Sequence, residues 1–182
     1  MIGKKNIVFG FLYLVATAAL GPYMLANTAA DVESAYIDKQ TPVGRLQDLK
    51  TNDFEEDLEP LPLEKITRAN TDGILAMNKV LNIQNPQSFM RSVHAHGNLE
   101  AVLNILAGLA LCFIGVAKVF KQVISYLFIA GAVLHSGMLY LAAFDQGWAF
   151  SILPVGPWLV LASLLLIGIA ALMDFRSEVV KD

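Results

Sequence analysis

Residues 97–117 read GNLEAVLNILAGLALCFIGVA, an apolar run that contains one acidic side chain, Glu100. A helix needs about 20 apolar residues to cross the roughly 30 Å hydrocarbon core of a membrane. An ionisable group in such a helix is costly unless it faces the interior of a helix bundle. The stretch therefore predicts a transmembrane helix, and Glu100 marks the face on which a functional site is expected.

The composition of the 182-residue chain indicates a membrane protein. Hydrophobic residues make up 55% of the sequence and charged residues 16%, and the mean hydropathy is +0.54. Soluble domains are on average much less apolar. The net charge is −3 and no basic stripe is present, so we expect no nucleic-acid partner.

Four runs reach spanning length, which predicts an all-α membrane protein with four transmembrane helices in a bundle. The expected spans are residues 7–27, 88–117, 123–144 and 152–173. We interpret the whole chain, 1–182, as a single multi-pass membrane domain, with membrane lipid as its surroundings and a bacterial inner membrane as its expected location.

Basic residues predict the orientation of these spans. Lys4 precedes the first span, Lys118 lies between the second and third, and Arg176 follows the fourth. With four spans these positions lie on one side, and short basic segments favour the cytoplasm. We therefore expect both the N-terminus and the C-terminus to be cytoplasmic.

Residues 28–87 are the only long hydrophilic segment and are predicted to form an outer, extracytoplasmic loop. Within it, residues 53–62 are acidic and broken by proline, which is typical of irregular structure. Apolar spacing predicts short helices at residues 28–39 and 71–83. The second is an amphipathic helix either at the membrane interface or in a small soluble cap. Pro86 is expected to open the second membrane helix.

Polar side chains follow one face of the second span. His96, Glu100 and Asn104 are spaced by four residues and so share a face, whereas His94 points away from His96. Glu100 lies about 6 Å and Asn104 about 12 Å below His96 along the helix. The third span should bring His135 to the level of Asn104.

Tyr140, further along the third span, is expected at about the depth of Glu100. Packing of the second and third spans then predicts a pocket lined by these polar side chains: His96, Glu100, Asn104, His135 and Tyr140.

Four interpretations suit such a pocket. A histidine in an apolar bundle is a good axial ligand for heme. His96, Glu100 and His135 could instead hold a non-heme metal, with His135 as an alternative ligand. The third alternative is structural, with His96 paired to Glu100 and His135 bonded to a helix carbonyl. A proton or quinone role also stays open.

At these residues the chain resembles the membrane-bound styrene oxide isomerases. The resemblance rests on residues 91–104, RSVHAHGNLEAVLN, on the following basic turn, on a third span with a polar residue at position 135 and Tyr140, and on residues 147–157. It covers the three C-terminal spans. The family implies a homo-oligomer, a trimer, that binds heme b between protomers through a histidine and uses ferric iron as a Lewis acid to open an epoxide to an aldehyde.

The resemblance also implies roles for individual residues. His96 matches the heme ligand, Asn104 the family's asparagine, His135 its aspartate position and Tyr140 its tyrosine. Asn104, His135 and Tyr140 would then line the side of a small hydrophobic substrate, and Glu100 would fix the tautomer of His96. The competing interpretation is a non-catalytic membrane subunit or scaffold of a larger, respiratory-type complex.

Overall fold

The computed structural model describes residues 1–180 and is helical almost throughout, which confirms the all-α fold class. Its contacts divide the chain into two compact units. The membrane unit comprises Met1–Pro22 with Phe89–Asp182, and the hairpin unit comprises Tyr23–Ser88. We expected one domain carrying an outer loop. The segment expected to be a loop instead forms a unit of its own because it has its own packed core.

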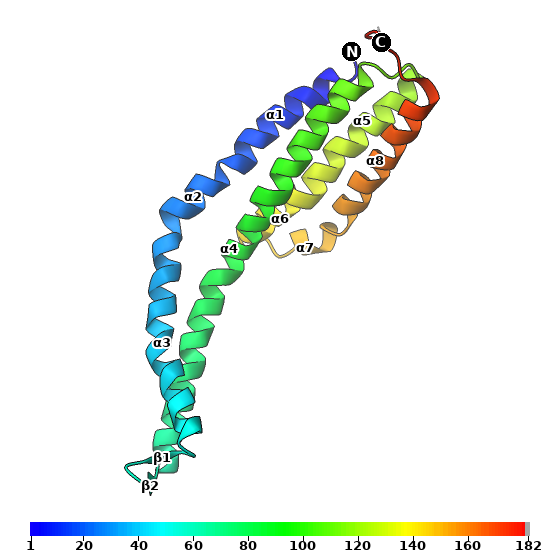
Figure 1. The fold of residues 1–182 in the computed structure, drawn as a ribbon. Coiled ribbons are helices and arrows are strands. Elements are labelled where there is room, and N and C mark those ends of the chain that lie inside the picture. Colours follow the sequence, from blue (N-terminus) through cyan, green and yellow to red (C-terminus); the bar gives the residue numbers. More distant parts are fainter. Residues whose placement is uncertain (181–182) are drawn as a thin grey trace. The chain divides into compact units, whose positions relative to one another are not determined.

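The membrane unit is built from helices that run side by side (Figure 1). In chain order it contains α1 (Lys4–Ala18), the start of α2 (Leu20–Asn27), the end of α4 (Leu63–Leu111), α5 (Lys118–Ala132), the π-helix η1 (Val133–Gly137), α6 (Met138–Ala143), α7 (Ala149–Ile152) and α8 (Val155–Asp174). The N- and C-termini lie at the same end of this unit (Figure 1).

Among the described residues, three helical stretches are long and apolar enough to cross a membrane. They are Lys4–Asn27, Lys118–Ala143 and Ala149–Asp174, and they correspond to the first, third and fourth expected spans. The expected second span is not among them, for two reasons. Helix α4 ends at Leu111 rather than continuing to residue 117, and residues 94–104 include five His, Asn and Glu side chains.

The segment after α4 is tied to the C-terminal segment. The amide of Gly115 donates to the carbonyl of Asp174 at 2.8 Å, and the amide of Arg176 donates to the carbonyl of Phe113 at 2.9 Å. These bonds satisfy backbone groups that a longer α4 would have paired internally. They explain why the helix stops before the apolar run does.

Close helix packing holds the membrane unit together. Its core contains Leu111 at the end of α4, Phe128 on α5 and Ala170 on α8. A Cβ atom at Gly10 on α1 would lie 2.6 Å from the carbonyl oxygen of Ala101 on α4, so glycine is needed for this approach. Small residues allow such contacts between membrane helices.

The hairpin unit pairs α3 (Ala29–Thr51) antiparallel with the first part of α4. Three polar contacts show the register: Gln87 donates to Thr28 at 2.5 Å, Gln84 to Tyr36, and Lys79 to Asp38 at 2.6 Å. Leu49, Leu61 and Ala69 form a small apolar cluster near the far end. The partner positions on α4 fall as the positions from Thr28 to Asp38 rise, which indicates a continuous antiparallel interface between the two helices.

The predicted outer loop is therefore wrong in its secondary structure. The short helices expected at 28–39 and 71–83 are parts of α3 and α4, and α4 does not begin at Pro86. Proline removes one helical hydrogen bond but does not prevent a helix whose flanks are held by packing. Pro42 likewise lies inside α3.

The irregular acidic stretch expected at 53–62 contains the turn between the two long helices. Strands β1 (Glu55–Glu56) and β2 (Glu59–Pro60) pair there in an antiparallel two-residue ladder. Asp57 and Leu58 join them with φ angles of 55° and 66°, which is the geometry of a type I′ hairpin turn. The acidic, proline-containing sequence thus forms a tight turn.

Candidate functional site

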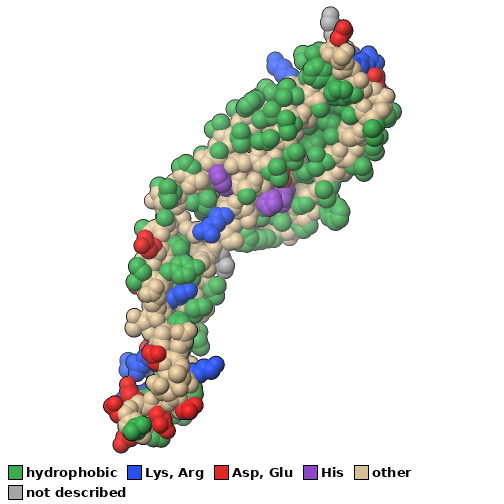
Figure 2. Space-filling view, in the orientation of Figure 1, with side chains coloured by type: hydrophobic (Ala, Val, Ile, Leu, Met, Phe, Trp, Pro, Cys, Tyr) green, Lys and Arg blue, Asp and Glu red, His purple; other side chains and the backbone are tan. Residues whose placement is uncertain are grey.

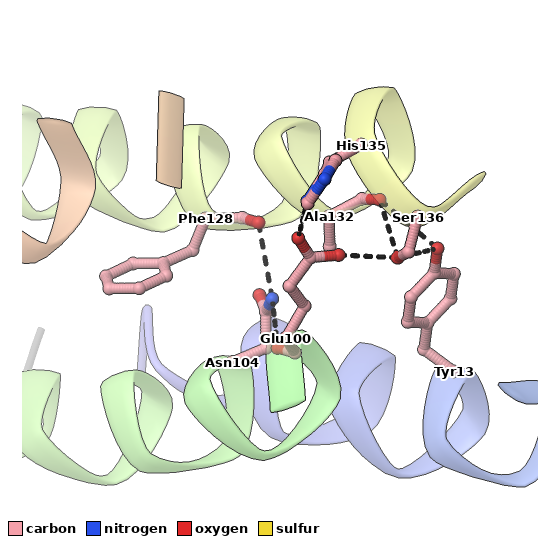
Figure 3. Close-up of polar contacts among 7 residues, drawn as sticks. All are labelled: Tyr13, Glu100, Asn104, Phe128, Ala132, His135 and Ser136. Carbon is pink, nitrogen blue, oxygen red and sulfur yellow. Dashed lines mark hydrogen bonds and ion pairs between the residues drawn. The ribbon is translucent and has the colours of Figure 1, made fainter. Parts of the chain in front are cut away.

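The Glu100 carboxylate is the centre of a polar cluster inside the membrane unit (Figure 3). Its residue is only 4% exposed. His135 Nδ1 lies 2.5 Å from Oε1, and Ser136 Oγ donates to Oε2 at 2.5 Å. Both carboxylate oxygens are therefore satisfied, which a buried carboxylate requires.

The π-helix explains how two consecutive residues reach the same carboxylate. His135 and Ser136 both lie in η1, the wide turn Val133–Gly137 between α5 and α6. In a regular α-helix, consecutive side chains point about 100° apart. Single π-helical turns are frequent at functional sites. Here the turn directs both side chains to Glu100.

Helix α8 packs directly against this turn. A Cβ atom at Gly156 would lie 2.6 Å from the Cα of His135, so any larger residue would displace one of the two backbones. Gly156 is near the start of α8. The glycine therefore lets α8 lie directly against the backbone of η1.

Tyr13 on α1 completes the cluster from a third helix. Its hydroxyl lies 2.8 Å from Ser136 Oγ and donates to the carbonyl of Ala132 at 3.2 Å. Our sequence analysis named no site residue in the first span and missed this residue. Its signal was the stripe Asn6, Gly10, Tyr13 and Thr17, which are spaced by four, three and four residues and so share one helix face.

A second set of buried amides lies one turn below Glu100. Asn104 Nδ2 donates to the carbonyls of Glu100 at 3.0 Å and Phe128 at 3.2 Å. Asn6 Nδ2 donates to Asn104 Oδ1 at 3.1 Å and to the carbonyl of Ser125 at 3.0 Å. Among the described residues, no buried side-chain nitrogen or oxygen lacks a partner. The hydrogen-bonding groups of these buried polar side chains are therefore satisfied within the chain.

The three histidines differ in how they are held. His94 Nδ1 contacts the carbonyl of Thr17 at 3.0 Å, and His135 is held by Glu100. His96 is exposed, and its ring lies 4.9 Å from that of His135 at a tilt of 53°. No hydrogen bond reaches the His96 ring from residues 1–180. His96 is therefore the exposed imidazole of the three, with neither ring nitrogen hydrogen-bonded within residues 1–180.

The structure brings together most of the expected site residues. Glu100 and His135 are in direct contact, His96 lies beside His135, and Asn104 packs one turn below. We expected Glu100 to hold His96, but both of its oxygens are taken by His135 and Ser136. Tyr140 does not join the group, since it is 41% exposed and its ring lies 4.9 Å from that of Phe144.

Tyr140 was expected on the Glu100 face because regular helical spacing was assumed through the third span. The π-helix adds a residue to the turn before it, and this changes the direction of every side chain that follows. The aromatic hydroxyl within the polar cluster belongs to Tyr13 instead.

An apolar groove of about 270 Å³ lies in the membrane unit, further along α4 than His96, which is not one of its lining residues. Its α4 wall includes Leu103 and Ala107, which are seven and eleven residues beyond His96 and share its helix face. Phe128 on α5 and Leu164 and Gly168 on α8 line the other sides. The groove thus begins about 10 Å along the helix from the exposed imidazole.

Buried Glu100 and His135 form an acid and base pair whose proton can lie on either group. Either placement leaves the pair without net charge, which suits a low-dielectric interior. Removing one partner would leave the other buried and unpaired. The pair can therefore fix the orientation of the His135 ring, and its hydrogen bond is a path along which a proton can pass between the two groups.

Within residues 1–180 there is no group of three side chains from histidine, cysteine, aspartate or glutamate that could hold one metal ion. The non-heme site expected from His96, Glu100 and His135 is thus not assembled as a three-ligand group. The chain matches no protein-family model, no curated protein and no solved structure.

Proposed function

We propose that the chain is a multi-pass protein of a bacterial inner membrane with four spans. Three are the long apolar helical stretches, and the fourth is the end of α4, residues 89–111, which packs among them. Four of the five polar side chains that lower the apolarity of α4, all except His96, form hydrogen bonds, as intramembrane polar groups do. Both termini are then cytoplasmic by the positive-inside rule.

We further propose that the protein binds heme b with His96 as an axial ligand. The observation that carries this proposal is the state of the three histidines: one ring nitrogen of His94 and one of His135 are bonded within the chain, whereas His96 is exposed and no hydrogen bond within residues 1–180 reaches its ring. A flat, apolar macrocycle needs one free imidazole and an apolar surface beside it. His96 supplies the imidazole, and the exposed side chain of Leu99, three residues further along α4, supplies apolar surface beside it.

The resemblance to styrene oxide isomerases suggests the reaction. Bound ferric heme would supply a Lewis acid for opening the epoxide of a small hydrophobic substrate. The role of His135 is to present a ring of fixed orientation beside His96, because Glu100 and Ser136 hold it. Asn104 supports this arrangement from below rather than touching substrate, and a homo-oligomer, a trimer by resemblance, would cover the exposed His96 face.

Absorption spectra of the detergent-purified protein test heme binding. We expect a Soret band and a pyridine hemochrome of b type, lost in His96→Ala and kept in His94→Ala, the matched histidine control on the same helix. Loss of pigment in His135→Ala with retention in His96→Ala would move the ligand to His135. The proposal would be refuted if the purified wild-type protein had no Soret band and added hemin produced no Soret band of protein-bound heme.

A second candidate function is a non-catalytic subunit of a larger membrane complex that handles protons at Glu100. It is favoured by the continuous chain of hydrogen bonds from Tyr13 through Ser136 and Glu100 to His135. Such chains of titratable side chains mark proton relays in membrane proteins. Infrared difference spectra should then show a carboxyl band that changes with pH and disappears in Glu100→Gln, in a protein without a Soret band.

A further inference from the structure

A basic groove lies at the end of the membrane unit where α1 and α5 begin. It is open, has a volume of about 790 Å³, and is lined by residues of the two helices and the N-terminal turn. These are Met1, Ile2, Lys4, Lys5, Val8, Phe9, Lys118, Gln122 and Tyr126. Three of the lining residues are lysines and none is acidic, so the groove carries a strong positive charge.

The lysines of this groove are not neutralised by neighbouring carboxylates. Lys5 donates to the side chain of Gln122, and its ammonium lies 3.4 Å from the centre of the Tyr126 ring. Lys4 and Lys118 are exposed, and within residues 1–180 neither forms an ion pair. Both are the first residues of their helices, where free backbone N–H groups add partial positive charge.

The groove changes from cationic to apolar along the helix axis. Phe9 lies about 7 Å further along α1 than Lys4, at the rise of an α-helix. Val8 is 48% exposed and Tyr126 61% exposed, so apolar side chains continue from the lysines along the unit's surface. α1 and α5 both belong to stretches that are apolar and long enough to span a membrane. The lysines therefore lie at the level of lipid headgroups.

We propose that this groove binds an anionic phospholipid, with the phosphate between Lys4, Lys5 and Lys118 and an acyl chain along Val8 and Phe9. The inference rests on the membrane placement of α1 and α5 and is independent of heme binding. Basic pockets between membrane helices recognise acidic headgroups in this way. A free phosphate would use the lysines alone and gain nothing from the apolar half.

Native mass spectrometry of the full-length, delipidated protein with equal amounts of phosphatidylglycerol and phosphatidylcholine tests the proposal. We expect the wild type to retain mainly phosphatidylglycerol. In Lys4→Gln/Lys118→Gln the preference should fall about fivefold for each lysine, in line with the typical attraction of a basic residue to an anionic membrane surface. Lys50→Gln/Lys65→Gln in the hairpin unit is the control with the same charge change and should keep the preference.

Equal retention of the two lipids by the wild type, or an equal loss in the control, would overturn the proposal. Inorganic phosphate at millimolar concentration should not displace the lipid, and displacement would assign the groove to a free anion instead. Circular dichroism checks the fold, and the single variant Lys4→Gln decides if the double variant does not fold. The Soret region of the same samples reports heme separately, so failure of one proposal is distinguishable from failure of the other.

Discussion

The two units of this protein place their polar groups in opposite ways. In the membrane unit, apolar side chains cover much of the surface. The polar side chains of its interior, Glu100, Asn104 and Ser136 among them, are buried and hydrogen-bonded. In the hairpin unit, charged side chains lie outside, and the ion pair of Lys79 with Asp38 has both side chains more than half exposed. Figure 2 shows acidic side chains gathered toward the end of the hairpin unit.

This difference indicates where the loss of a polar contact should lower stability most. Water competes for the groups of an exposed pair, so losing one partner costs little. A buried group has no alternative partner, so losing its contact exposes the full cost of desolvation. The same kind of substitution should therefore have very different effects in the two units.

The largest effect is expected from Glu100→Ala. The change removes the partner of the partly buried His135 ring and one of three partners of Ser136, and should lower the free energy of unfolding by about 3–5 kcal/mol. Unfolding by sodium dodecyl sulfate in mixed micelles measures it. Glu64→Ala, at an exposed glutamate of the same helix, is the control and should stay near wild type. Equal stability of the two variants would mean that position 100 is not buried.

A smaller loss is expected from Gly156→Ala. The added Cβ would overlap the backbone of η1 at His135, and overpacking of this kind costs about 1–3 kcal/mol. Gly168→Ala on the same helix meets no atom within 4 Å and should be neutral or slightly stabilising. The same unfolding assay compares them. A neutral Gly156→Ala would show that α8 does not press on the π-helix.

Asn104→Ala should cost about 1 kcal/mol, the usual range for a hydrogen bond between membrane helices. The variant removes two donated bonds and one accepted from Asn6. Asn27→Ala, whose amide bonds only within its own helix, provides the comparison. If both variants behave alike in thermal unfolding, the buried amides do not couple α1 to α4.

The smallest effect is expected for Lys79→Ala in the hairpin unit. Its exposed ion pair with Asp38 should contribute no more than about 1 kcal/mol, and less at high salt. Thermal unfolding followed by circular dichroism at low and high salt measures this. A loss as large as that of Glu100→Ala would remove the distinction between the two units.

Much of the membrane unit could be predicted from sequence because its signals are strong. Runs of apolar residues gave three stretches that the structure contains, and the spacing of His96, Glu100 and Asn104 placed them on one face of a helix. The contact of Glu100 with His135 joins α4 to η1 across 35 positions, and depth along two spans was enough to expect their proximity.

What the sequence did not reveal depends on packing between distant segments. The extended α3 and α4 are stabilised by each other, so their weak local signals read as a loop. The π-helix has no sequence signature, and without it Tyr140 was placed in the cluster where Tyr13 belongs. The end of α4 at Leu111 is set by bonds to the C-terminal segment.

The central claim is that Glu100 and His135 form one buried pair in the membrane unit. A double-mutant cycle of Glu100→Ala and His135→Ala, measured as free energies of unfolding, tests it most directly. Side chains in contact should show a coupling energy of about 1–3 kcal/mol, because the second substitution costs little once the first is made. Losses that add to within about 0.5 kcal/mol would contradict the account, since separated residues behave independently.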